Sequence, residues 1–236
     1  MSVATLRITH IGGPTALLEF HGARFLTDPT FERAGTAYPT PQYTLRKTTG
    51  PAISVERLGA VDAILLSHDH HFDNLDTAGR ALLARVPQVL TTPAGAARLG
   101  GNALGLTAWQ SVDLPTETDG VVRVTGTPAR HGPAEGDRGP VTGFVVAARD
   151  HPDACIYVSG DTVWYEGVAE VARRFPVTVA LLFMGAARVR EVGPHHLTLT
   201  AAEGVATARD TVSDCWRRAS LPTSPSNDPA GTAAFR

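Results

Sequence analysis

Histidine and aspartate side chains crowd into one short segment of the sequence, "HDHHFD" at residues 68–73. Its candidate ligands are His68, His70, His71 and Asp73. Imidazole nitrogens and carboxylate oxygens are the ligands that zinc and similar metals prefer. Alternate residues of an extended segment project to the same side, so His68 and His70 would face one metal together. The segment therefore predicts part of a metal site.

A second interpretation of this segment needs no metal. A polar loop before a helix often supplies the N-cap, and Asp73, Asn74 and Asp76 are all suitable capping residues. Three clustered histidines exceed what a cap requires, so we favour the metal site. A zinc-type ion lowers the pKa of a bound water to about 7. Asp73 is then both a candidate ligand and the candidate catalytic residue, because it would orient that water or accept its proton.

Three further candidates follow predicted strands elsewhere in the chain. His131 follows "VVRVTGTPAR", Asp161 follows "CIYVSG" and Asp28 follows "RFLT". In layered α/β folds, loops that leave the carboxyl ends of strands commonly build one site. We therefore expect His131 and Asp161 to be metal ligands. Asp28 is expected to hold the loop that follows it, behind the ligands.

Polar residues in two other segments are weaker candidates for contact with the metal or the substrate. His196 is expected behind the ligands or against the substrate, in the same supporting group as Asn74, whereas His195 is expected to be an ordinary loop residue. Residues 28–54 are rich in Pro, Thr and Gly and are predicted to form a long surface loop. Arg46 and Lys47 of this loop are expected to be solvated, the alternative being contact with an anionic substrate.

The elements that must position these residues are short strands and helices. "TALLEF" and "ARFLTD" flank "HG", which predicts a hairpin with a two-residue turn. "VDAILLS" predicts a strand buried on both faces, and "LDTAGRALLARV" has helical spacing. Thr200 and Glu203 have the spacing of a capping box at the start of a helix. Strand-rich and helix-rich stretches occur twice, which favours two sheets packed face to face with helices outside.

Composition limits the classes of protein to which the chain can belong. The 236 residues, 43% of them hydrophobic, suit one domain, which we place at residues 1–210. Residues 211–236 are predicted to be a disordered or atypical tail. A net charge of -2 argues against nucleic-acid or membrane partners, and the expected partner is a small-molecule substrate. Two cysteines and no long apolar run suggest a reduced, cytoplasmic protein, whose oligomeric state the sequence leaves open.

Taken together, the motifs resemble the metallo-β-lactamase superfamily, in particular its branch of ascorbate-6-phosphate lactonase-like hydrolases. The match runs in order through "THIGGPTALLEFHGARFLTDPTF", "DAILLSHDHHFDNLD", "TPARHGP", "YVSGDTVWY" and "HLTLTAAEGV", or roughly residues 5–210. The resemblance implies a four-layer αββα sandwich with an incomplete C-terminal portion. It also implies a metal-dependent hydrolase that uses metal-bound hydroxide on a lactone, ester, amide or phosphodiester. The implied cofactor is a divalent metal, zinc first, with manganese or iron as alternatives.

Two departures from the family pattern concern the number of metals. The family motif is H-x-H-x-D-H, and this sequence has one residue more, so either His70 or His71 is the second histidine. Asn74 stands where the last histidine of the motif belongs, and no histidine follows His196. The resemblance therefore implies a site for one metal and an altered or truncated C-terminus. The alternative function is a catalytically impaired or inactive metal-binding homologue that lacks the C-terminal ligand segment.

Overall fold

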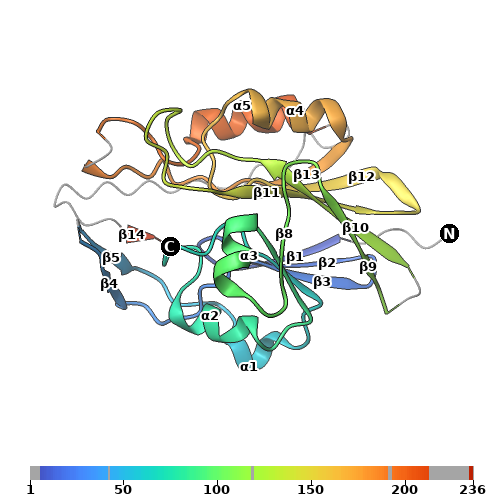
Figure 1. The fold of residues 1–236 in the computed structure, drawn as a ribbon, viewed down its shortest axis with the longest axis horizontal. Helices are drawn as coiled ribbons and strands as arrows, with labels where there is room; N and C mark the ends of the chain where they lie inside the picture. The colour runs from blue at the N-terminus through green and yellow to red at the C-terminus, as the bar shows by residue number, and fades with distance from the viewer. Residues whose placement is uncertain (1–5, 42, 118–119, 191–192, 213–233, 236) are drawn as a thin grey trace.

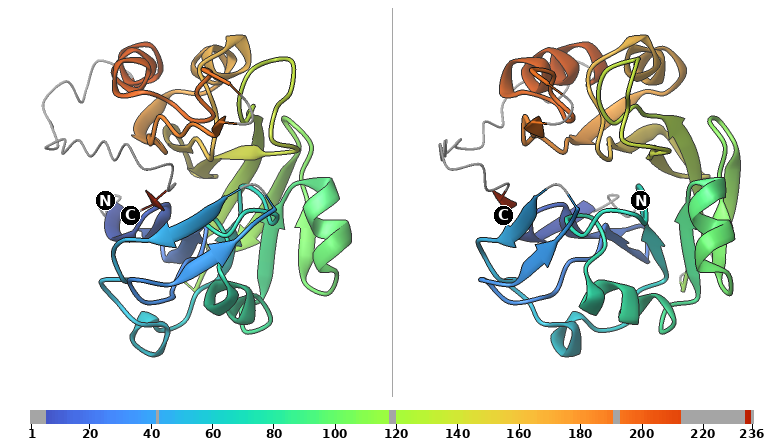
Figure 2. Two further views of the ribbon diagram at one scale, coloured as in Figure 1. Left: turned by 90° about the vertical axis from the view of Figure 1, so that its left-hand side faces the viewer. Right: turned by 60° about the vertical axis from the view of Figure 1, so that its left-hand side comes forward.

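Two β-sheets face each other at the centre of the molecule, and helices lie on their outer sides (Figure 1). This arrangement confirms the expected four-layer αββα sandwich. Figure 2 shows from two further sides that α4 and α5 cover one outer face, while α1 and α2 lie at the opposite one. The computed structural model describes residues 6–41, 43–117, 120–190, 193–212 and 234–235.

The first sheet has the strand order β1-β2-β3-β6-β7-β8. Its first three strands are antiparallel, and the predicted hairpin between β2 and β3 is confirmed, with His21 and Gly22 both at positive φ in the turn. The strands β3, β6, β7 and β8 are parallel. The elements of this half are β1 (Leu6–Gly12), β2 (Thr15–Phe20), β3 (Ala23–Thr27), α1 (Val55–Leu58), β6 (Ala63–Leu65), α2 (Thr77–Leu83), β7 (Gln88–Thr91), α3 (Pro93–Leu99) and β8 (Ala103–Gly105).

The second sheet has the order β13-β12-β11-β10-β9 and is antiparallel except for the β12–β13 pair. Its α5 begins with the predicted capping box, in which Thr200 and Glu203 each bond the backbone of the other. The elements of this half are β9 (Ser111–Pro115), β10 (Val121–Pro128), β11 (Thr142–Ala148), β12 (His151–Val158), α4 (Glu166–Arg174), β13 (Val177–Leu181) and α5 (Ala201–Thr211). The sequence patterns do not predict β8 or β9.

Alternation along the strands explains why each sheet has apolar contacts on both faces. Successive side chains of a strand point to opposite sides. Leu18 lies in the apolar cluster between the two sheets, whereas its neighbour Leu17 packs with Leu82 behind the first sheet. On the second sheet, Tyr157 faces outward and packs with Val168 of α4. The three apolar clusters therefore occupy the three spaces between four layers.

The prediction of a long surface loop at residues 28–54 is wrong in part. This segment contains α1's N-cap residue, Ser54, and a hairpin of β4 (Ala37–Pro39) and β5 (Thr44–Lys47). Tyr38 and Leu45 of the hairpin are buried, so it packs against the domain. The sequence signal failed because each strand is very short and the flanking Pro and Thr residues resemble a loop.

The predicted tail lies mostly outside the described residues. Within residues 211–236, the described parts are the end of α5 and the short strand β14 (Ala234–Phe235), which runs parallel to β5. Of the two cysteines, Cys155 is buried and free, and burial raises the pKa of its thiol to about 11. In the described ranges, no helix has the length and apolar character needed to cross a membrane.

Candidate metal centre

The candidate ligands come from loops at the carboxyl ends of strands in both sheets. His68 follows β6 of the first sheet, and His131 and Asp161 follow β10 and β12 of the second sheet. Because the sheets pack face to face, these ends meet, and the ligand atoms of His68, His131 and Asp161 all lie within 4.8 Å of one another. The site therefore spans the interface between the two sheets.

Three imidazole rings converge at this edge. His71 Nδ1 lies 2.8 Å from His68 Nε2 and 3.2 Å from His131 Nε2. Asp161 Oδ2 lies 3.7 Å from the same nitrogen of His131. Ligand atoms on a tetrahedral zinc ion lie about 3.3 Å apart, given Zn–N distances of about 2.0 Å. The ligand atoms of His68, His131 and Asp161 all lie within 4.8 Å of one another, and His71 Nδ1 lies within 3.2 Å of a nitrogen of each of the other two histidines.

Hydrogen bonds on the outer side of two rings indicate where their protons lie. His131 Nδ1 lies 2.8 Å from the carbonyl oxygen of Leu197, which only accepts, so we infer that Nδ1 carries the proton. The hydroxyl of Ser67 donates to Asp28 Oδ2 at 2.6 Å, so it accepts from His68 Nδ1 at 2.9 Å. In neutral rings, Nε2 of His68 and of His131 then each present a lone pair to the cluster.

The cluster as a whole fits a cation. Burial, followed by the charges of neighbouring histidines, lowers the pKa of His68 and of His71, the latter to about 2. Burial also lowers the pKa of His131. These rings are therefore neutral near pH 7, and their lone pairs are free to bind a metal. A single N–H on His71 Nδ1 cannot donate a full hydrogen bond to both His68 Nε2 and His131 Nε2. One metal ion, by contrast, can bind the lone pairs of all three nitrogens.

His70 occupies a different position from His71. Its ring lies beside the cluster, with its centroid 4.8 Å from that of His68, and its ligand atom is within 4.8 Å of those of His68 and His71. However, His70 Nε2 lies 2.8 Å from the carbonyl oxygen of Arg138, and the residue is exposed. The geometry thus favours His71 as the second histidine of the motif. The extra residue is accommodated by turning His70 toward the 131–139 loop.

Asp73 lies next to the cluster rather than within it. It lines the same small cavity as His71, His131 and Asp161, but its carboxylate belongs to neither group of closely spaced ligand atoms among the described residues. Burial, followed by the negative charge of Asp161, raises the pKa of Asp73 to about 6. Burial likewise raises the pKa of Asp161 to about 6. This position suits a group that handles a proton near the metal more than a direct ligand.

Asp28 and Asn74 lie behind the His68 ring and are hydrogen-bonded to each other. Asp28 is fully buried and accepts from the backbone N–H and the hydroxyl of Ser67, each at 2.6 Å. Asn74 Nδ2 donates to Asp28 Oδ2 at 2.8 Å. Burial raises the pKa of Asp28 to about 8, although these hydrogen bonds act in the opposite direction. The network links β3 to the ring of His68 through Ser67.

A glycine allows the two sheets to approach each other beneath the cluster. Gly160 precedes Asp161 and has φ of +59°, which L side chains rarely adopt. A Cβ at this position would lie 2.6 Å from Thr142 O and 2.8 Å from Ser67 Cβ. The "SGD" sequence is therefore required by packing as well as by the carboxylate that follows it.

The capping alternative is correct for one residue. Asp76 is the N-cap of α2, and its Oδ1 accepts from Gly79 N at 2.7 Å. Capping therefore leaves Asp73 and Asn74 free for other roles.

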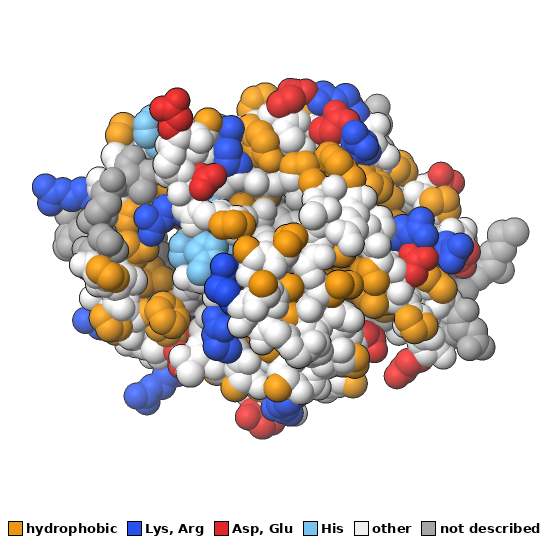
Figure 3. All heavy atoms as spheres, in the orientation of Figure 1, with side chains coloured by type: hydrophobic (Ala, Val, Ile, Leu, Met, Phe, Trp, Pro, Cys, Tyr) orange, Lys and Arg blue, Asp and Glu red, His pale blue; other side chains and the backbone are white. Residues whose placement is uncertain are grey.

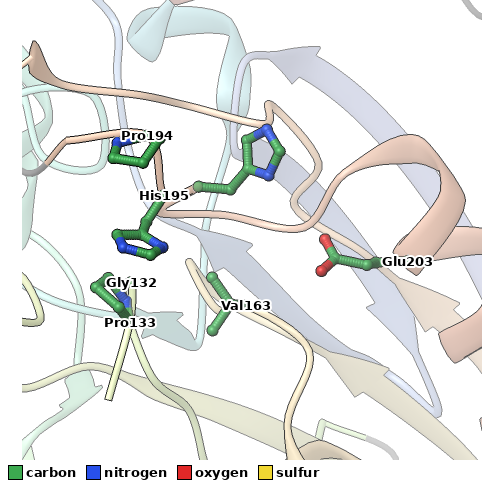
Figure 4. Close-up of a pocket in the computed structure, with 7 residues that line it drawn as sticks. Gly132, Pro133, Val163, Pro194, His195 and Glu203 are labelled. Atoms are coloured by element: carbon green, nitrogen blue, oxygen red, sulfur yellow. The ribbon is translucent and has the colours of Figure 1, made fainter. Parts of the chain in front are cut away.

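His195 and His196 do not join the candidate ligands. Both line a neighbouring cavity of about 280 Å³, together with Pro194 and Glu203 (Figure 4). His196 Nε2 accepts from Arg188 Nη2 at 2.6 Å. His196 thus contacts Arg188, which lines the metal cavity, and it precedes Leu197, whose carbonyl oxygen bonds His131.

The structure places the basic residues differently from the sequence expectation. Arg46 is exposed, as expected, but Lys47 is buried, and its Nζ lies 3.2 Å from Asp76 Oδ2. The prediction that Lys47 is solvated is therefore wrong, because the β4–β5 hairpin packs this side chain against the start of α2. Arg138 and Arg188, which line the metal cavity, were missed, since loop arginines carry no distinctive sequence signal.

Comparison with known sequences supports the same family as the motifs. A family model described as "Beta-lactamase superfamily domain" matches residues 23–215. UPF0173 protein YddR of Bacillus subtilis is 28% identical over 176 residues, which is 70% of this chain and 66% of YddR. An uncharacterized protein of Mycobacterium tuberculosis, Rv0906, is 38% identical over 71 residues, 30% of this chain and 18% of that protein. The matched part is less than two thirds of either relative.

Solved structures share the fold over most of the chain. An isothiocyanate hydrolase from Delia radicum gut bacteria is 25% identical, with a TM-score of 0.69 over 86% of this chain and 80% of that one. A protein from Veillonella parvula titled "a possible metal-dependent hydrolase" has a TM-score of 0.71 at 21% identity, over 89% of this chain and 82% of that one. Because the family model covers most of the sequence and the fold agrees, the chain belongs to the metallo-β-lactamase superfamily.

Proposed function

We propose that this protein is a metal-dependent hydrolase of a small molecule. The observation that carries the proposal is the convergence of His68 Nε2, His71 Nδ1 and His131 Nε2, beside the carboxylate of Asp161. Three imidazoles and one carboxylate suit zinc first, and they also suit manganese or iron. The similarity to an isothiocyanate hydrolase supports hydrolysis as the class of reaction.

Different residues of the chain would have different roles in such a reaction. A bound divalent metal supplies Lewis acidity and makes a water molecule more acidic. Asp73 lies in the cavity beside the candidate ligands, with its pKa raised to about 6, so it can accept a proton from the attacking water and deliver it to the leaving group. Leu197 O and Ser67 Oγ hold the His131 and His68 rings in orientation.

The substrate class follows from the type of reaction. Water attacks a carbonyl or phosphoryl centre, so the substrate is a lactone, ester, amide or phosphodiester. A lactone agrees with the lactonase-like branch that the motifs resemble. The cavity at the ligands measures about 60 Å³, and its walls combine polar and apolar side chains. The arrangement of the site does not favour the alternative of an inactive homologue, because the candidate ligands for one metal lie together.

Metal content tests the proposal directly. We expect one equivalent of zinc, manganese or iron in the purified protein by elemental analysis, and its loss in His68→Ala, because His68 contributes an inward lone pair. His151→Ala is the matched control, since that histidine is exposed on β12 and outside the cluster. Retention of a full equivalent of metal by His68→Ala would contradict the assignment.

Hydrolysis is tested in parallel on the metal-loaded protein. A panel of small lactones, esters, amides and phosphodiesters should include at least one substrate whose turnover stops on chelation. Asp73→Asn should then lower kcat by about 10²-fold or more while metal content stays near wild type. A metal-loaded protein that hydrolyses no member of any class would favour the inactive alternative.

A further inference from the structure

Two arginines share the cavity of the candidate metal centre. The walls of this cavity include Arg138 and Arg188 together with His71, His131 and Asp161. Figure 3 shows histidine side chains reaching the surface on one face, with Lys or Arg side chains next to them. The guanidinium groups therefore lie where the remainder of a bound substrate would lie.

Arg138 is held in place by its own backbone. Its N–H donates to the carbonyl oxygen of His131 at 2.8 Å, and its carbonyl oxygen lies 2.8 Å from His70 Nε2. The loop is thus fixed to two histidines of the metal region, and the side chain is half-buried. Its positive charge adds to burial and the neighbouring histidines in lowering the pKa of His71, which indicates that the guanidinium lies close to the cluster.

Arg188 approaches the same cavity from a different segment of the second sheet's half. It belongs to the segment after β13, and its Nη2 donates to His196 Nε2 at 2.6 Å. This bond orients the guanidinium group. Because a guanidinium has five N–H donors, its other N–H groups can still donate to a ligand. His196 thereby acquires a role next to the site without being a ligand.

Neither guanidinium forms an ion pair with a carboxylate among the described residues. Elsewhere on the surface, Arg98, Arg123 and Arg173 each pair with an acidic side chain. The two carboxylates in this cavity, those of Asp73 and Asp161, belong to the candidate metal centre. Within the part of the chain that the structure describes, these two arginines beside one cavity have no carboxylate partner, so they are available to a ligand.

We infer that Arg138 and Arg188 form an anion subsite, and that the substrate carries a carboxylate or phosphate group in addition to the bond that is hydrolysed. The planar guanidinium fork matches both anions in geometry. Leu45, Val189 and Leu197 line the cavity as well, so a short apolar segment of the substrate would lie between its two polar ends. This inference rests on the proposed function, because it describes the part of the substrate that is not cleaved.

Binding to the zinc-loaded protein tests the subsite without turnover. Benzoate, phenyl phosphate and neutral benzamide are titrated by calorimetry into wild type, Arg138→Gln and Arg188→Gln. We expect wild type to bind the anions in preference to benzamide, and each variant to weaken anion binding about tenfold, because a charge-assisted hydrogen bond is lost. Benzamide binding should not change. The stronger of the two anions in wild type identifies carboxylate or phosphate as the group recognised.

Controls separate this result from general effects of charge and of folding. Arg7→Gln removes an exposed arginine of β1 that does not line the cavity, and it should bind all three ligands as wild type does. Arg138→Lys keeps the positive charge but lacks the planar guanidinium group, so it should retain part of the anion affinity. Circular dichroism checks that every variant is folded.

Metal content, measured in the same samples, distinguishes the two possible failures. Wild type that takes up zinc but binds neither benzoate nor phenyl phosphate better than benzamide overturns the subsite and leaves the proposed function intact. Equal weakening of anion binding in Arg7→Gln and Arg138→Gln also overturns it. Failure of wild type to take up any metal contradicts the proposed function, and this inference with it.

Discussion

At the scale of single residues, the orientation of each ring decides which histidines can share an ion. His68 and His131 use their Nδ1 atoms for outward hydrogen bonds, which leaves Nε2 directed inward. His71 instead directs Nδ1 inward, and His70 turns its Nε2 to a backbone carbonyl. Neighbours in the sequence thus differ in role because their partners differ.

The two neighbouring histidines provide a matched pair of variants. His71→Ala should lose the bound metal, because His71 Nδ1 contacts both other imidazoles, whereas His70→Ala should keep close to one equivalent. Elemental analysis of the two purified variants under the same conditions measures the difference. Loss of metal in His70→Ala, with retention in His71→Ala, would assign the second histidine of the motif to residue 70.

The pH dependence of stability follows from the burial of His71. Burial lowers its pKa to about 2 in the folded state, below the ordinary value of 6.5 expected when the chain unfolds. As the pH falls below 6.5, the unfolded state gains a proton that the folded state excludes, so this contribution to stability is lost toward low pH. In chelator, wild type should lose stability relative to His71→Gln by at most about 1.4 kcal/mol per pH unit.

Urea unfolding of both proteins between about pH 7.5 and 4 measures this difference over the window in which the unfolded imidazole titrates. The comparison cancels the opposing effects of Asp73 and Asp161, which are present in both proteins. Curves that stay parallel below pH 6.5 would show that His71 accepts a proton in the folded state.

At the scale of elements, the β4–β5 hairpin and the helix α2 hold the histidine loop between them. The side chains of Lys47 and Asp76 are almost completely buried, and they pair at 3.2 Å. Asp76 also accepts from Glu32 N at 2.7 Å and caps α2. The Tyr38 ring stacks on Phe72 within the loop, with centroids 4.9 Å apart. The hairpin therefore contacts the histidine loop at Phe72, between His71 and Asp73, and the start of α2 at Asp76.

Removing one member of this buried pair should be costly. Lys47→Met leaves Asp76 without its counter-charge, and we expect the free energy of unfolding to fall by about 3–5 kcal/mol. Arg46→Met alters the adjacent exposed residue and should change it by no more than about 0.5 kcal/mol. Urea denaturation of the metal-free proteins provides both values. Equal stability of the two variants would show that the pair contributes little.

At the scale of the whole molecule, the candidate centre connects the two sheets. His68 and His71 follow a strand of the first sheet, and His131 and Asp161 follow strands of the second. Apart from this edge, the sheets are joined by apolar contacts such as those of Phe25 and Phe144. An ion bound by ligands from both sheets would therefore cross-link the two halves of the sandwich.

Metal should consequently stabilise the whole domain. A ligand that binds only the folded state at about 100 times its Kd adds about 2.7 kcal/mol to stability. We expect zinc to raise the Tm of wild type in a thermal scan and to leave that of His131→Ala unchanged, since the variant loses the ligand from the second sheet. A similar rise in both proteins would place the ion outside the interface between the sheets.

The sequence by itself determined features that depend on local interactions. The "HG" turn, the capping box of Thr200 and Glu203, and the fully buried β6 all follow from short-range spacing and residue type. The sequence also predicted the types of the candidate ligands and their positions after strands, because polar residues at the end of an apolar run are easily recognised. The short strands β8 and β9 and the β4–β5 hairpin gave too few alternating residues to be recognised.

Only the tertiary structure decided which side chains meet. The orientations of His70 and His71 depend on Arg138 and His131, which lie about sixty residues further along the chain. The pairing of Lys47 with Asp76 joins two segments whose contact no periodicity encodes. Spacing along the chain records interactions over a few residues, whereas packing of one sheet on the other sets the directions of rings and charges across the interface.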